Sequence, residues 1–195
     1  IGGNALKSVT TEGSLTAIGF GAAQANTSGS GIVALGFHSL IGNNIGNYNT
    51  GIGMYSLRYN TSGSRNTGVG YKALQQNTTA KYNTAIGYNA LLNADRTTDT
   101  DGYNIGLGDA AGSNITTGNK NTFLGASTSA SAVSGTNQTV VGYGASGQAD
   151  NSVTLGDANV TAVYMSQDKG ATVYAASLVS GSGSSTGVFK SDGDY

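Results

Sequence analysis

Cysteine, proline and tryptophan are absent from this chain of 195 residues, and charged residues make up only 10% of it. Without cysteine the chain forms no disulfide and no thiolate metal site. No apolar run approaches the length that crosses a membrane, so we expect no membrane insertion. The formal net charge of -1 provides no field that would attract nucleic acid, and no nucleic-acid partner is expected.

Glycine is abundant in place of these residues. The 32 glycines stand among many Asn, Ser and Thr residues, and such a composition cannot build a thick core of Leu and Phe. Order must therefore come from backbone hydrogen bonds and from small residues packed in register.

One glycine recurs at a nearly fixed interval, always directly after an aliphatic residue. The steps between its copies are 17 residues, except for one step of 21 and a last step of 14. A fixed period of this length is typical of repeat architectures. The ten aligned pairs are Ile1-Gly2, Ile18-Gly19, Leu35-Gly36, Ile52-Gly53, Val69-Gly70, Ile86-Gly87, Leu107-Gly108, Leu124-Gly125, Val141-Gly142 and Leu155-Gly156. Because the first copy lacks its beginning, we expect the chain to be a fragment of a longer protein.

Each repeat unit predicts a short strand. A β-branched residue stands two positions before the aliphatic residue, as Thr84 does before Ile86, and residues two apart share one face of a strand. We expect this face to point into the coil. The opposite face is mostly Ala and Gly, and together with a column of Leu residues it is a candidate surface for packing against sister chains. A second short strand is expected to begin at Ala90 and Leu91.

Stacking of such units predicts an all-β fold, a parallel β-solenoid of about ten coils that spans residues 1–159. At about 4.8 Å per coil, nine steps make a rod of about 43 Å. A roll this thin has little interior, so we expect it to associate laterally with closed rotational symmetry. Residues 160–179 are predicted to form a β-hairpin cap or neck, and residues 180–195 a Gly/Ser-rich connector and tail.

The units Asn151–Gly156 (NSVTLG) and Asn83–Gly87 (NTAIG) resemble the head repeats of trimeric autotransporter adhesins. The resemblance covers about residues 1–160 and implies a left-handed parallel β-roll in a homotrimer, although most repeats here are longer than those common in that family. Closely similar repeats occur in tail fibres and attachment proteins of phages and large viruses. Segments 160–166, 169–175 and 191–195 resemble the region that precedes the self-cleaving intramolecular chaperone of phage tail fibres.

This resemblance implies a structural and binding segment of a trimeric viral tail fibre or attachment fibre. The chain would then belong to the virion and contact a glycan or protein receptor on the host surface, without cofactor or catalysis. The head of a bacterial surface adhesin is the nearest alternative. An ice-binding solenoid is a further one, which the expected inward direction of the Thr residues disfavours. A polysaccharide-cleaving spike would need paired carboxylates on one face, and ten Asp and Glu residues in all are few for this.

Two groups of residues are candidates for a binding site. The first is an aromatic stripe after the repeated glycine, with Met54 in the same column, and its members are Phe20, Phe37, Tyr71, Tyr88 and Tyr143. Such a stripe suits either stacking on sugars or packing between chains, and we favour packing.

The second group lies in the 21-residue step, where Asp95, Asp99 and Asp101 form a Ca²⁺-like loop pattern. It lacks the bidentate Glu and the full ligand count of a calcium site, so a solvated loop without metal is favoured. The single histidine, His38, is expected to be an exposed corner residue.

Overall fold

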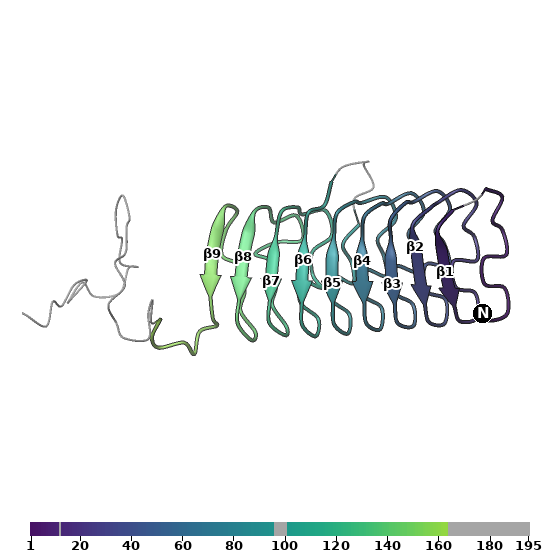
Figure 1. Cartoon of the computed structure of the whole chain (residues 1–195). Helices are drawn as coiled ribbons and strands as arrows, with labels where there is room; N and C mark the ends of the chain where they lie inside the picture. Colours follow the sequence, from purple (N-terminus) through teal and green to yellow (C-terminus); the bar gives the residue numbers. More distant parts are fainter. Residues whose placement is uncertain (12, 96–100, 164–195) are drawn as a thin grey trace, which may run out of the picture. The chain divides into compact units, whose positions relative to one another are not determined.

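The computed structural model describes residues 1–11, 13–95 and 101–163, and this part of the chain contains nine short strands and no helix. The strands lie in one parallel sheet in the order of the sequence, each paired with the next (Figure 1). The prediction of an all-β parallel β-solenoid is therefore confirmed. The strands are β1 (Leu15–Ile18), β2 (Ile32–Leu35), β3 (Thr50–Ile52), β4 (Thr67–Val69), β5 (Thr84–Ile86), β6 (Ile105–Leu107), β7 (Thr122–Leu124), β8 (Gln138–Val141) and β9 (Ser152–Leu155).

The glycine period sets the register of this sheet. Thr67 pairs with Thr84 across one 17-residue step, and Thr84 pairs with Ile105 across the 21-residue step. The last step, of 14 residues, likewise pairs Thr139 with Val153. Insertions and deletions between strands thus leave the columns aligned. The first of the ten copies has no strand, although Ile1 still accepts a hydrogen bond of 2.8 Å from the amide of Gly19.

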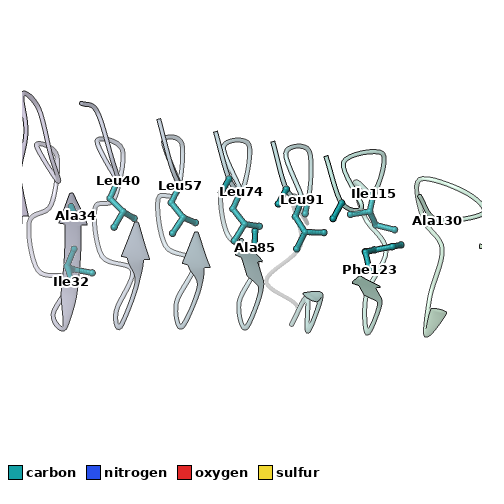
Figure 2. Packing of buried hydrophobic residues seen from close by; sticks show 14 of the residues in the cluster. Ile32, Ala34, Leu40, Leu57, Leu74, Ala85, Leu91, Ile115, Phe123 and Ala130 are labelled. Atoms are coloured by element: carbon teal, nitrogen blue, oxygen red, sulfur yellow. The ribbon is translucent and has the colours of Figure 1, made fainter. Parts of the chain in front are cut away.

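The strand face that points into the coil is the opposite of the predicted one. Ala85 has no exposed surface, whereas its neighbour Ile86 is 45% exposed and Thr84 is half-buried. The interior is filled instead by a column of leucines, which Figure 2 shows in successive coils. A strand residue facing these leucines has room for only Gly or Ala, so the Thr and aliphatic residues must point outward.

The predicted second strand of each coil is absent from the described residues. In the coil of β3, Tyr55 and Leu57 both have positive φ, 63° and 49°, and this left-handed conformation is incompatible with a strand. The Leu57 amide still donates to the carbonyl of Ala73 in the next coil at 2.9 Å. The Asn60 amide instead donates back to Leu57 at 3.2 Å. The return wall is therefore a stack of turns, with only part of its amides bonded from coil to coil.

The repeated glycine is required by two constraints that act together. At Gly53 the φ angle is 120°, which side chains disfavour, and a Cβ atom there would lie 2.6 Å from the carbonyl oxygen of Gly70. Gly125, four coils further on, has φ of 131°, and its Cβ would lie 2.7 Å from the oxygen of Gly142. Successive glycines thus stack backbone on backbone, and this contact explains why the period is marked by Gly.

Buried asparagines form two ladders that the sequence analysis did not predict. In one, the Asn60 amide nitrogen donates to the Oδ1 of Asn43 at 2.7 Å and to the carbonyl of Gly63 at 2.9 Å. In the other, the Oδ1 of Asn49 accepts from the main-chain amide of Asn66 at 2.9 Å. Both ladders satisfy buried polar groups that the return wall and the corners would otherwise leave unpaired. The members of the first are Asn26, Asn43, Asn60 and Asn77, and those of the second are Asn49, Asn66, Asn83, Asn104 and Asn121.

Residues Ile1–Thr161 form one compact unit, and Ala162–Tyr195 form a second. Of the second unit the structure describes only residues 162 and 163. Residues 160–163 contain no strand, and the rest of the predicted hairpin and the whole connector lie outside the described residues. Among the described residues there is no helix that is long and apolar enough to span a bilayer.

Candidate binding surface

Two columns of side chains cover the outer face of the sheet along the whole rod. One column carries the β-branched residues and the other carries the aliphatic residues that precede the repeated glycines. Five members of the aliphatic column are 36% to 48% exposed, namely Ile18, Ile52, Ile86, Leu124 and Leu155. We call these two columns the outer sheet stripe. Large exposed apolar patches on soluble proteins mark interaction surfaces, so the outer sheet stripe is a candidate binding surface of this chain.

The predicted aromatic stripe lies beside this surface, and the structure brings four of its five members into two stacked pairs. Phe20 and Phe37 stack with their ring centroids 5.8 Å apart, and Tyr71 and Tyr88 stack at 5.1 Å. Each ring of a pair covers one face of the other. Tyr143 lies three coils beyond Tyr88 and is 77% exposed.

A second set of residues joins the two pairs, and the sequence analysis missed it. His38 stacks on Phe37 at 3.9 Å, and Tyr55 contacts the rings of both His38 and Tyr71, at 5.9 and 6.2 Å. His38, Tyr55 and Lys72 occupy the same repeat position, two residues after the glycine, and all have positive φ. This shared position was visible in the sequence, but its residues differ in chemistry and show no common type.

Two cations lie against these rings. The guanidinium carbon of Arg58 is 4.6 Å from the ring centroid of Tyr55 and 5.0 Å from that of Tyr59. The Nζ of Lys72 is 5.1 Å from the ring centroid of Tyr71. Cation–π contacts of this geometry stabilise by about 0.5–1 kcal/mol at exposed sites.

His38 is half-buried, so the expectation of an exposed corner residue was wrong. The stacked ring of Phe37 covers part of it, and its Nδ1 is enclosed without a hydrogen-bond partner. Burial, followed by the positive charge of Arg58, lowers the pKa of His38 below its ordinary value of 6.5. The lowered pKa favours the neutral form of the imidazole.

Another ladder runs along the amino-terminal side of the strands. Arg65 lies between the rings of Tyr48 and Tyr82, with 5.8 and 5.3 Å to their centroids, and its Nη1 donates to the Tyr82 hydroxyl at 2.6 Å. Tyr82 in turn stacks on Tyr103 at 4.8 Å. A hydrogen bond to the carboxylate of Asp101 raises the pKa of Tyr103. An acidic group therefore already occupies one end of this ladder.

The structure gives two of the three candidate calcium ligands structural roles. The carboxylate of Asp95 accepts hydrogen bonds from the amide and the hydroxyl of Thr78, at 2.9 and 2.7 Å. The main chain of Asp101 pairs with that of Lys81 in an isolated parallel β-bridge. Asp99 lies outside the described residues. Within the described ranges no three His, Cys, Asp or Glu residues are grouped closely enough to hold a metal ion.

Comparison of the chain with family models, with curated proteins and with solved structures gives no match. The fold alone defines the class of this protein, a parallel β-solenoid with an apolar outer stripe. The resemblance of its repeats to those of fibres and adhesins stays a prediction.

Proposed function

We propose that the chain is a structural and receptor-binding segment of a homotrimeric viral fibre, such as a phage tail fibre, exposed on the virion. The observation that carries this proposal is the outer sheet stripe, which leaves aliphatic side chains in water along the whole rod. The resemblance of the repeats to those of fibres and adhesin heads supports the same assignment.

A second and a third copy of this chain are the best occupants of the stripe. The columns repeat at the spacing of the strands, so an identical rod presents aliphatic residues at the matching interval. Closed rotational symmetry covers each stripe and leaves no open apolar edge. Complete burial of a fully exposed Ile or Leu stabilises by about 1.5–3 kcal/mol. The five most exposed residues of the stripe are 36% to 48% exposed, so each contributes less than half of this when a neighbouring chain covers it.

Charge placed in the stripe should break the trimer without unfolding the coil. We expect light scattering to give a trimer for the natural chain and a monomer for the double variant Ile52→Asp with Ile86→Asp. The matched control is Ile45→Asp with Val133→Asp, because these residues are also exposed but lie outside the stripe. The control should remain a trimer. A natural chain that is a stable folded monomer would refute the trimer.

The assignment to a virus has its own test. Immunogold electron microscopy with antibodies against the chain should label fibres that project from virus particles. Labelling of bacterial cell surfaces without particles would instead support the alternative, the head of a trimeric autotransporter adhesin.

The ice-binding alternative was disfavoured because the Thr residues were expected to point inward. In the structure they face outward, so this argument against ice binding no longer applies. Six of the nine residues in the β-branched column are Thr, namely Thr16, Thr50, Thr67, Thr84, Thr122 and Thr139. A regular Thr array on a flat sheet can order water. The exposed aliphatic column beside it favours packing between chains instead. Thermal hysteresis of the purified chain, absent from a Thr67→Lys, Thr84→Lys variant, would favour ice binding over the fibre.

A further inference from the structure

We infer that the corner formed by His38, Tyr55, Arg58, Tyr59, Tyr71 and Lys72 binds acidic saccharides, that is, sugar rings that carry carboxylate or sulfate groups. We call these six residues the basic corner. The inference rests on the proposed receptor-binding role and names the chemistry of the receptor.

The charges of the chain are separated along the rod. Between Gly13 and Ala94 the sequence has four basic residues, Arg58, Arg65, Lys72 and Lys81, and no Asp or Glu. The described carboxylates all lie at or beyond Asp95. The net charge of -1 is therefore the sum of a positive net charge before Asp95 and a negative net charge from Asp95 onward. An acidic ligand is attracted to the coils of the positive half.

The basic corner contains two of these cations in one connected cluster. Arg58 lies over the rings of Tyr55 and Tyr59, and Lys72 lies over Tyr71. Tyr55 and Tyr71 are themselves in ring contact, at 6.2 Å. No carboxylate occurs in the coils that carry the two cations, so both charges are available to a ligand.

The groups that the corner offers are mainly hydrogen-bond donors and positive ring edges. Arg58 and Lys72 offer N–H groups, and the three tyrosines offer hydroxyls. The edge of an aromatic ring is the positive part of its quadrupole. A ligand that combines an anionic group with many hydroxyl acceptors matches this arrangement.

The arrangement favours a saccharide over a nucleic acid. Single-stranded nucleic acids bind by stacking bases on free aromatic faces, and here Tyr71 already stacks on Tyr88. The affinity for a nucleic acid also grows with the number of phosphates that cations neutralise, and the corner supplies only two cations close together. A short acidic glycan with one or two anionic groups can be bound by these two cations.

The basic corner is also free of the proposed trimer contact. Tyr55 and Arg58 follow the glycine at the end of β3, on the turns that lead away from the sheet. In Figure 1 the chain turns away from the sheet below the arrowheads of the strands. A trimer that buries the outer sheet stripe leaves these turns accessible.

Binding of the full chain to immobilised polymers tests this inference. The probes are polygalacturonate for carboxylates, dextran sulfate for sulfates, neutral dextran, and oligo(dT) as a nucleic acid. We expect retention by at least one acidic polysaccharide and none by neutral dextran. The variant Arg58→Gln with Lys72→Gln should weaken that binding by about tenfold or more. The two acidic polymers distinguish carboxylate from sulfate recognition.

The control variant, Lys7→Gln with Lys120→Gln, removes the same number of positive charges outside the corner, and both of these lysines are exposed. It should keep at least half of the natural affinity. The inference is overturned if neither acidic polymer binds, if oligo(dT) binds as well as the polysaccharides, or if the control loses as much as the corner variant. Circular dichroism and light scattering confirm that each variant remains folded and assembled.

Failure of this inference and failure of the proposed function give different results. If labelled natural chain binds host cells and the corner variant binds them equally, the receptor-binding role stands and the basic corner is not its site. If the natural chain binds no cells and is not a trimer, the proposed function itself fails, whatever the polymers show.

Discussion

The coils before residue 95 and those after residue 101 stack through the same column of glycines but fill their interior differently. In the earlier coils the return wall supplies a leucine and the strand supplies a small residue, as Leu74 faces Ala85. In the later coils the sizes are reversed, because Phe123 fills the interior from the strand. A Cβ atom on Gly112 would collide with the Phe123 ring, so the return wall there has room for Gly alone.

The polar content of the two halves differs as well. The first of the two asparagine ladders ends at Asn77, and the following positions of its column hold Ala94 and Ile115. In this column apolar carbon replaces hydrogen-bonded amides, whereas the second ladder continues through Asn104 to Asn121. The comparison teaches that stacked glycines and coil-to-coil hydrogen bonds define the coil, while its filling can vary if the total volume is kept.

The largest effect should come from the feature that both halves share. We expect Gly53→Ala and Gly125→Ala each to abolish folding of the chain, since the new Cβ meets backbone of the next coil and the φ angles disfavour a side chain. Circular dichroism and size-exclusion chromatography measure this. If only one of the two variants unfolds, the halves do not share their backbone requirement.

The next effect should come from the exchange of large and small residues. Phe123→Ala should lower the free energy of unfolding by about 3–5 kcal/mol, because it leaves a cavity in the core. Gly112→Leu alone should prevent packing. Together, the two substitutions copy the pair Leu74 and Ala85, and we expect the double variant to regain at least half of the loss. Urea denaturation gives these values, and a double variant no more stable than Phe123→Ala would show that the halves are not interchangeable.

The smallest of the three effects concerns the asparagine ladder. Asn60→Leu removes the hydrogen bonds that Asn60 makes with the Oδ1 of Asn43, the carbonyl of Gly63 and the Nδ2 of Asn77. Each of these three atoms keeps one other partner. We expect a loss of about 2–3 kcal/mol in the free energy of unfolding, because three buried hydrogen bonds of about 1 kcal/mol each are lost. The reciprocal change, Ile115→Asn, should lower the free energy of unfolding by a similar amount. The side chain of Ala94 in the preceding coil offers no hydrogen-bond partner to the side-chain amide of the new Asn. Urea midpoints that stay unchanged would mean that the ladder adds nothing to stability.

Part of the candidate binding surface could also be predicted from the sequence. Phe20, Phe37, Tyr71 and Tyr88 were found from their common position after the glycine, and they do lie in neighbouring contacts. Arg58 and Lys72 were missed because they are isolated in the sequence and the net charge is close to zero. Only the stacking of coils brings such separated residues against the same rings.

By itself, the sequence determined the period, the register and the parallel solenoid, because every strand repeats its glycine and its β-branched residue at fixed positions. It did not determine which face of the strand is inside. Alternation divides a strand into two faces but gives neither face a direction. The tertiary structure decided this through volume: Leu57 and its equivalents enter from a return wall of left-handed turns, so only small strand residues fit opposite them. Thr84 and Ile86 consequently face outward, where they form the surface on which the proposed assembly depends.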